Sequence, residues 1–113
     1  MHEVGIIHSA VLTAEQQAKA QGATRIHTLR LRIGRLSGVV PDALQFAFEA
    51  VSLGTIAEGG KLEIEDVPAA FWCEGCQAEF PSEDYLAECP KCHAVARELR
   101  RGREMELCSM EIS

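Results

Sequence analysis

The sequence predicts an α+β fold in which two helices pack on a small three-stranded sheet that carries an inserted cysteine-rich module. Three observations support this prediction. Two segments repeat apolar residues at helical spacing, three alternate like half-buried strands, and four of the five cysteines lie between residues 73 and 92. The chain has 113 residues, 47% of them apolar and 25% charged, which is the composition of an ordinary globular domain.

The first helix is expected over residues 4–21. Its apolar residues recur at intervals of three and four, as one face of a helix requires: Val4, Ile7, Val11, Ala14 and Ala18. Gly22 follows at the position where glycine commonly ends a helix. His8 also lies on this helix, and we expect it to be a surface residue and not a metal ligand.

The first strand is expected over residues 24–34. Leu29, Leu31 and Ile33 alternate with polar residues, which indicates a strand with one buried face. His27 shares the phase of the apolar residues, and we expect it at the sheet margin with its hydrogen bonds satisfied. The arginines of this region, at positions 30, 32 and 35, form a basic stripe. Because no aromatic residues interleave with it, we interpret the stripe as a solvated sheet face rather than a phosphate-binding surface.

The second helix begins at Pro41, a residue suited to the first helical position, and ends before Gly54. Its buried stripe is expected to contain Leu44, Ala47, Phe48 and Val51. A turn at residues 59–60 leads into the second strand, "KLEIEDV". Its leucine and isoleucine are expected to face inward and its glutamates outward.

The third strand is expected after Gly102, in "REMELCSMEIS". The apolar residues before Cys108 are out of phase with those after Ser109, so we predict a bulge between them. If this strand returns to the first sheet, residues 1–68 and 103–113 form one discontinuous domain and residues 69–102 an insertion. Cys108 is expected to be a thiol without a functional role.

Four cysteines give the insertion its chemistry: Cys73, Cys76, Cys89 and Cys92. They form two C-x2-C motifs separated by twelve residues, a spacing typical of a zinc ribbon. Four thiolates select zinc or iron, and four protein ligands without water indicate a structural zinc. Iron would instead make the module a rubredoxin-like electron carrier, and two redox C-x-x-C motifs are a further alternative. His93 follows directly, and we expect an exposed histidine, with hydrogen bonding to a thiolate or replacement of one as alternatives.

Charge and composition argue against several classes of function. The net charge of −6, and the excess of six acidic over four basic residues within 69–102, disfavour binding to nucleic acid or anionic lipid. For this reason a zinc-ribbon module that binds nucleic acid or protein ranks only as the second hypothesis. The chain has no apolar run long enough to span a membrane and no secretory signal, so we expect a cytoplasmic protein. No catalytic motif stands out, so we do not expect an enzyme.

The N-terminus, "MHE", offers a set of nitrogen ligands. The α-amine of Met1 and the imidazole of His2 both titrate near neutral pH, and the intervening amide lies between them. The amide of Glu3 can supply a fourth nitrogen. Nitrogen ligands in a plane suit Ni(II) or Cu(II) rather than zinc. Because histidine is large, we expect the initiator methionine to be retained.

Several stretches together resemble the HypA/HybF family, the nickel chaperones of hydrogenase maturation. The resemblance covers nearly the whole chain, in "MHE", "LRIGRLSGV", "ALQFAFEAVSLGT", "AEGGKLEIEDVPA", "CEGC", "CPKC" and "GREMELCSMEI". It implies a nickel-binding domain, an inserted zinc domain and a structural zinc on the four motif cysteines. It also implies a nickel site built from the Met1 amine, the His2 amide and imidazole, and the Glu3 amide.

The resemblance also implies a function and a set of partners. The chain would deliver Ni(II) to the large-subunit precursor of a [NiFe] hydrogenase together with a maturation GTPase, and in some family members it also supplies urease. We expect no nucleic-acid or membrane partner. A monomer is the expected state, with a dimer as the alternative.

Overall fold

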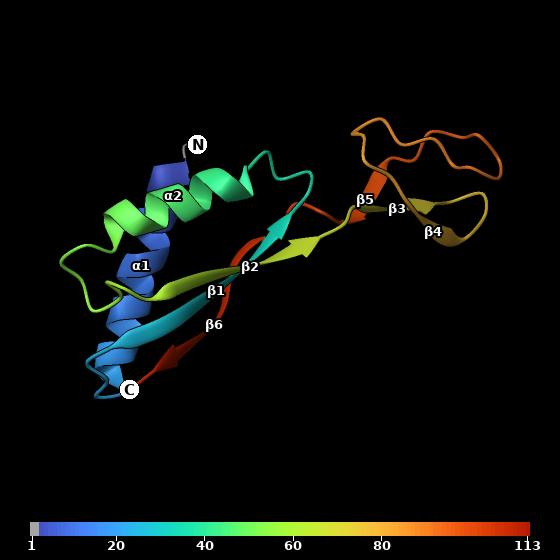
Figure 1. The fold of residues 1–113 in the computed structure, drawn as a ribbon. Helices are drawn as coiled ribbons and strands as arrows, with labels where there is room; N and C mark the ends of the chain where they lie inside the picture. The colour runs from blue at the N-terminus through green and yellow to red at the C-terminus, as the bar shows by residue number, and fades with distance from the viewer. Residues whose placement is uncertain (1–2) are drawn as a thin grey trace. The chain divides into compact units, whose positions relative to one another are not determined.

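The computed structural model describes residues 3–113, so the predicted ligands Met1 and His2 lie outside the described residues. The chain order is helix, strand, helix and then five strands (Figure 1). The elements are α1 (Glu3–Ala20), β1 (Ile26–Gly34), α2 (Pro41–Val51), β2 (Lys61–Val67), β3 (Ala70–Cys73), β4 (Ala78–Pro81), β5 (Glu98–Arg101) and β6 (Met105–Ile112).

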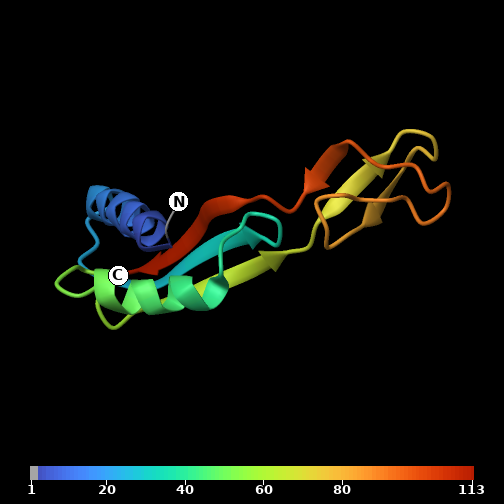
Figure 2. The ribbon, with the colours of Figure 1, turned by 90° about the horizontal axis from the view of Figure 1, so that it is seen from above.

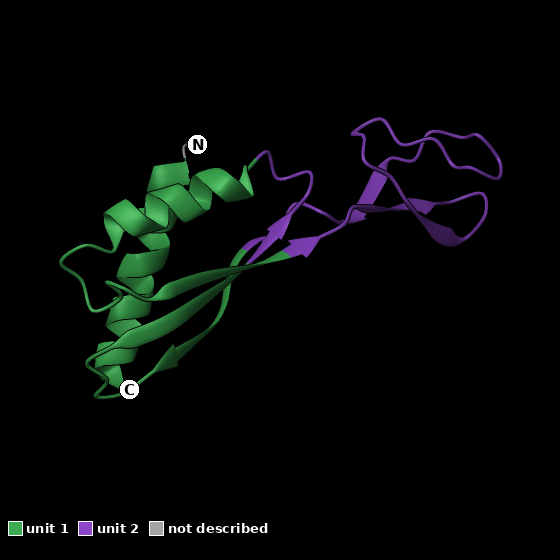
Figure 3. Cartoon of the chain, in the orientation of Figure 1, with its two compact units in different colours: residues 1–31, 39–65, 106–113 green, residues 32–38, 66–105 purple. Residues whose placement is uncertain are grey.

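The chain folds into two compact units that are interleaved in sequence (Figure 3). Unit 1 contains residues 1–31, 39–65 and 106–113, and unit 2 contains residues 32–38 and 66–105. Unit 2 therefore includes a short piece of β1 and its following turn, which the sequence pattern does not mark.

The larger sheet has the strand order β2-β1-β6. β1 and β2 run in the same direction in Figure 1, and α2 forms the crossover that a parallel pair requires. β6 runs antiparallel to β1, since Arg25 pairs with Ser113 at one end and Gly34 bonds to Glu104 at the other. The predicted α+β class, with two helices and a three-stranded sheet, is confirmed.

The core of unit 1 is built from the two helices and the sheet. The buried residues of α1 are those that the helical spacing predicts, except Val4: Ile7, Val11, Ala14 and Ala18. α2 contributes Leu44, Ala47 and Phe48, and it packs against α1. The side-chain amide of Gln45 on α2 donates a 2.8 Å hydrogen bond to the carbonyl of Leu62 on β2, which ties the crossover helix to its strand.

The beginning of β1 departs from the predicted alternation. Thr28 and Leu29 are both buried, so the phase changes between them, and His27 is exposed rather than in phase with the core. The His27 Nε2 atom lies 2.6 Å from the Ser113 hydroxyl. Its position at the sheet margin and its hydrogen bond are therefore as predicted, while its burial is not. Ser113, the residue after β6, supplies this polar partner.

Unit 2 contains a second sheet with the order β4-β3-β5, and a long segment without helix connects β4 to β5 (Figure 2). β3 pairs antiparallel with both neighbours. Its core combines apolar side chains with two of the motif cysteines: Leu36, Ala69, Phe71, Cys73, Phe80, Ala87 and Cys89. Leu36 comes from the segment after β1, so this core depends on residues distant in sequence.

Two glycines allow strands of unit 2 to approach closely. A Cβ atom at Gly34 would lie 2.1 Å from the carbonyl carbon of Gly102, a distance at which the backbone must move. Gly102 has a φ of +125° and would place its own Cβ 2.8 Å from the Cα of Ala69. Hydrogen bonds run through the same place, from the Leu36 amide to Gly102 (2.7 Å) and from the Gly34 amide to Glu104 (2.8 Å).

Candidate metal centre

The first C-x2-C motif lies at the turn of the β3–β4 hairpin. Cys73 is the last residue of β3 and pairs in register with Ala78. Gln77 follows Cys76 with a φ of +52°, in the left-handed region that side chains rarely adopt. Gly75 has no positive φ, so the tight turn uses the residue after the second cysteine instead of the glycine.

The second motif is built in the same way. Cys89 and Cys92 lie within a loop closed by a bridge between Glu88 and Val95. The amide of Cys89 donates to Ala94 (2.9 Å), and the amide of His93 donates to Cys89 (2.9 Å). His93 has a φ of +64°, so each motif is followed by a left-handed residue. The side chain of His93 is exposed, and its Nδ1 atom lies 3.6 Å from the Glu88 carboxylate.

The structure brings the four sulfur atoms together, all within 4.8 Å of one another. The Cys73 and Cys92 sulfurs are 3.5 Å apart, and those of Cys76 and Cys89 are 3.8 Å apart. A zinc–sulfur bond of about 2.3 Å implies sulfur–sulfur edges of about 3.8 Å in a regular tetrahedron. The residues therefore fit a tetrahedral metal ion held by four thiolates. Cys73 and Cys89 are buried, which keeps bulk water from one side of the cluster.

The four sulfurs differ in their readiness to ionise. The pKa of Cys89 is lowered to about 6, because the backbone N–H groups of Cys92 and then Lys91 bond to its sulfur. The pKa of Cys76 is raised to about 12 by its close contacts with the sulfurs of Cys92, Cys73 and Cys89. Four neighbouring thiols without a cation cannot all lose their protons, since each negative charge opposes the next. A metal ion must therefore displace protons when it binds here.

The third residue of the predicted nickel set is the first residue of α1. A carboxylate oxygen of Glu3 accepts a hydrogen bond of 3.3 Å from the backbone amide of Val40. Val40 is the N-cap residue of α2 and has no side-chain cap of its own. Glu3 therefore ties the start of one helix to the start of the other, a contact that the sequence pattern does not reveal.

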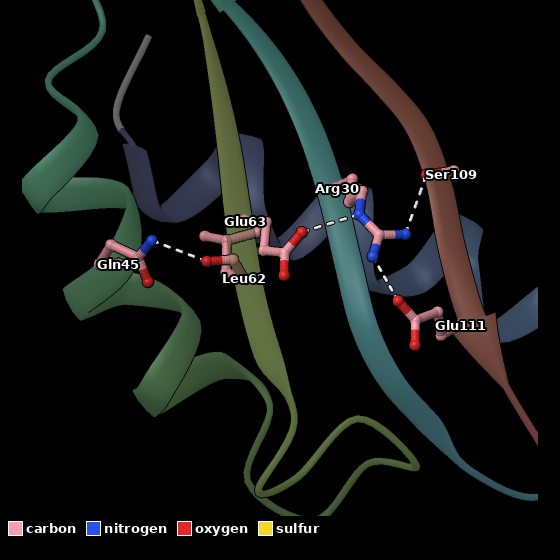
Figure 4. Close-up of polar contacts among 6 residues, drawn as sticks. All are labelled: Arg30, Gln45, Leu62, Glu63, Ser109 and Glu111. Atoms are coloured by element: carbon pink, nitrogen blue, oxygen red, sulfur yellow. Dashed lines mark hydrogen bonds and ion pairs between the residues drawn. The ribbon is translucent and has the colours of Figure 1, made fainter.

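Two arginines of the predicted basic stripe, Arg30 and Arg35, pair with carboxylates on neighbouring segments. On the face of the sheet opposite to the one that α1 crosses, Arg30 donates to Glu63 on β2 (2.8 Å) and to Glu111 on β6 (Figure 4). Hydrogen bonds to Glu111 and then Glu63 raise the pKa of Arg30 above its ordinary value. Arg35 pairs with Asp66 at 2.8 Å. These ion pairs agree with a solvated sheet face.

No helix in residues 3–113 combines the length and the apolar character needed to cross a membrane. A family model described as "Hydrogenase/urease nickel incorporation, metallochaperone, hypA" matches residues 1–112 of the chain.

Curated relatives resemble the chain over nearly its whole length. A protein of Picosynechococcus sp. named hydrogenase maturation factor HypA is 46% identical over 112 residues, and the match covers 99% of each chain. A protein of the same name from Roseiflexus sp. is 45% identical, with 98% of this chain and 91% of the relative covered.

Solved structures resemble it as well. The solution structure of a Ni metallochaperone HypA from Helicobacter pylori superposes with a TM-score of 0.68 and 27% identity, covering 99% of this chain and 97% of the other. A second solution structure, titled as that of a HypA protein, has a TM-score of 0.72 and 28% identity, covering 100% and 97%.

Proposed function

The chain belongs to the HypA family of nickel-incorporation metallochaperones for hydrogenase and urease, and from this membership we propose that it binds Ni(II) at its N-terminus and delivers it to the large subunit of a [NiFe] hydrogenase. The observation that carries the proposal is the match of the family model to residues 1–112, which include "MHE". Supply of nickel to urease is part of the same proposal, since the family description names both enzymes.

The proposed nickel ligands are the Met1 amine, the amide and imidazole of His2, and the amide of Glu3. The start of α1 suits this role, because a helix makes no i→i−4 hydrogen bond from its first four amide groups. Displacement of the Glu3 amide proton by the metal would therefore break none of the hydrogen bonds within the helix. Four nitrogens arranged in a plane match the preference of Ni(II).

A structural zinc ion on the four cysteines is the second part of the proposal. The sulfur separations fit four thiolate ligands, and none of the four positions is left for water. A zinc ion here would supply folding free energy to unit 2, whose core contains two of the ligands. A protein without colour that contains one zinc per chain would agree with this assignment, whereas a red protein would indicate iron.

The proposed protein is a carrier and not a catalyst. It would bind nickel, meet a maturation GTPase and the hydrogenase large-subunit precursor, and release the ion to that precursor. We propose that it works in the cytoplasm as a monomer, without nucleic-acid or membrane partners. Its own chemistry is limited to exchanging protons for a metal ion at two separate sites.

Calorimetric titration of Ni(II) into the untagged, zinc-loaded protein tests the nickel site. His2→Ala is expected to weaken binding by at least about a hundredfold, more than an outer-shell partner typically costs. Affinity is also expected to fall as the pH is lowered from about 8 to about 6, because protons compete for the amine and the imidazole.

The control is His8→Ala, which removes a histidine of α1 that the proposal does not use and should leave the affinity unchanged. A one-residue extension before Met1 should do the same damage as His2→Ala, since it removes the free amine. An affinity that stays constant in His2→Ala, or across this pH range, would rule out the proposed ligands.

A further inference from the structure

A basic groove lies along β5, outside both proposed metal sites. The groove has a volume of about 560 Å³, and residues of unit 2 line it. They are one continuous segment, Ala96 to Glu104, together with Phe71 and Tyr85. Four arginines face two glutamates among these residues, which leaves a net charge of +2 in a chain whose total is −6. Four of the seven basic residues of unit 2 therefore line this groove.

Two of the four arginines already form ion pairs with carboxylates of the same unit. Arg100 lies 4.4 Å from the ring centre of Trp72 and pairs with Glu98 at 2.7 Å. Arg101 pairs with Glu79 on β4 and lowers the pKa of that carboxyl. These contacts hold the side chains in place, but they leave little of their charge for a ligand.

The other two arginines carry uncompensated charge. Within residues 3–113, no carboxylate lies within ion-pair distance of Arg97 or Arg103. Arg103 lies over the ring of Tyr85, 5.9 Å from its centre, and the Tyr85 hydroxyl donates a 2.6 Å hydrogen bond to the Leu36 carbonyl. The tyrosine is thereby fixed, and it positions one free guanidinium at the groove.

The segment that lines the groove includes β5, an edge strand of the second sheet. In the order β4-β3-β5, β5 has a partner on one side only among the described residues. An edge strand presents N–H and C=O groups to which another extended chain can bond. β5 comprises the four residues Glu98–Arg101, so it would pair with about four residues of such a chain, roughly 13 Å at 3.3 Å per residue, with Arg97 and Arg103 flanking the paired segment.

We propose that this groove docks an extended, acidic segment of a partner protein, which adds a strand to the free edge of β5 and places carboxylates at Arg97 and Arg103. A polypeptide suits the site better than nucleic acid does. The phosphates of a nucleic acid would be repelled by the two glutamates of the groove and by the negative net charge of the chain. A peptide with a few spaced carboxylates requires only that two of them pair with the free guanidiniums of Arg97 and Arg103. This proposal goes beyond the nickel site and does not depend on it.

Fluorescence anisotropy with a synthetic peptide tests the proposal on the full-length, zinc-loaded chain. The probe is a labelled peptide of about ten residues, about the length of the groove segment, with glutamate and threonine in alternation. Saturable binding is expected, and the same peptide with glutamine for glutamate should bind at least tenfold more weakly. Methylation of alternate backbone nitrogens should weaken binding by a similar factor, because it removes the strand-forming donors.

The double variant Arg97→Glu/Arg103→Glu should bind the acidic peptide at least tenfold more weakly. Its matched control is Lys19→Glu/Lys61→Glu, which changes the net charge equally away from the groove and should stay within twofold of the unchanged chain. Zinc content and circular dichroism would establish that each variant is folded. If Arg97→Glu/Arg103→Glu fails to fold, Arg97→Gln/Arg103→Gln provides the same comparison with a smaller change of charge.

Several results would overturn the proposal. They are no binding of the acidic peptide, equal binding of the glutamine peptide, equal losses in the control, and equal binding of the methylated peptide. Tighter binding of a single-stranded oligonucleotide through the same two arginines would assign the groove to nucleic acid. The charges around β5 could instead serve only to prevent aggregation at an exposed strand edge. In that case the acidic peptide would not bind. Nickel affinity should not change in any of these variants, so this test is separate from that of the nickel site.

Discussion

Glu3, at the start of α1, combines an observed hydrogen bond with a proposed role in nickel binding. Its side chain accepts a hydrogen bond from Val40, and its backbone nitrogen is the proposed fourth nickel ligand. A substitution that changes only the side chain should therefore separate them. We expect Glu3→Ala to weaken nickel binding by less than about tenfold, since the nitrogen remains and one hydrogen bond is worth about 1 kcal/mol.

Parallel titrations of Glu3→Ala, Glu3→Gln and His2→Ala would measure this. Glu3→Gln keeps an acceptor for the Val40 amide and should resemble the unchanged protein. If Glu3→Ala were as damaging as His2→Ala, the carboxylate itself would be a ligand and the backbone assignment would be wrong.

His93 and Gln77 occupy equivalent positions after the two C-x2-C motifs, both with positive φ. A side chain in this region costs about 1–2 kcal/mol, while glycine there costs about 0.5–1 kcal/mol in chain entropy. We expect His93→Gly to leave stability unchanged or to raise it by up to about 1 kcal/mol, and His93→Val to lower it by about 1–2 kcal/mol. Thermal unfolding of the zinc-loaded variants would measure both effects.

Lys91→Gly is the matched control, because Lys91 lies in the same motif without a positive φ. Glycine there brings only its entropy cost and should destabilise. A large loss of zinc affinity in His93→Gly would mean that the imidazole takes part in metal binding, which the sequence alone leaves open.

At the scale of the elements, the approach of the strands at Gly34 and Gly102 is the most restrictive feature. A methyl group at Gly34 would overlap the Gly102 carbonyl, and the clash involves backbone on both sides. We expect Gly34→Ala to destabilise the protein by about 3 kcal/mol or more, at the upper end of the cost of overpacking. Chemical denaturation would measure this cost.

Gly75→Ala is the control for that substitution. Gly75 has open space around its Cβ position and no positive φ, so alanine there should change stability by less than about 0.5 kcal/mol. Equal losses in the two variants would indicate that the close approach is not the cause.

Periodicity in the sequence located the longer elements well. The predicted strand "KLEIEDV" coincides with β2, and the predicted second helix begins at Pro41 as α2 does, although α2 ends at Val51, earlier than the Gly54 stop predicted. The short strands β3, β4 and β5 were not predicted separately, because four residues contain too little alternation to recognise. In β6 the exposed pair Cys108 and Ser109 separates the half-buried Leu107 from Met110, in keeping with the predicted bulge, which stays a prediction.

The candidate sites differ in how far the sequence could reveal them. The spacing of the cysteines fixes two local turns, so the sulfur cluster could be predicted from sequence alone. The hydrogen bond from Val40 to Glu3 and the ring of Tyr85 beneath Arg103 join segments far apart in the chain. No local pattern encodes such contacts, because they depend on how the elements pack.

For the whole molecule, zinc is expected to stabilise one unit more than the other. The sulfur cluster belongs to the core of unit 2, whereas the buried helix residues of unit 1 include no metal ligand among those described. Removal of zinc by a chelator should therefore broaden or shift the amide resonances of residues 66–105 while most of the helical circular dichroism remains. Complete loss of the helical signal would show that unit 1 cannot fold without the metal.

Zinc binding should also depend steeply on pH. The raised pKa of Cys76 means that its thiol keeps its proton at neutral pH without metal, whereas the lowered pKa of Cys89 favours its thiolate. Binding therefore releases protons, and affinity should fall as the pH decreases. Calorimetry in buffers of different ionisation enthalpy should find more than one proton released per zinc. Release of none would contradict binding through thiolates.

Because the chain passes between the two units four times, a single proteolytic cut cannot release either of them. A nick at Gly59–Gly60 would leave two fragments, each of which contains parts of both units. Such a nicked protein should run as one species on a native gel and as two after denaturation. Transplanting the ribbon as residues 66–105 would likewise omit Leu36, which fills its core and receives the Tyr85 hydroxyl. A fusion protein that contains this module must therefore also contain residues 32–38.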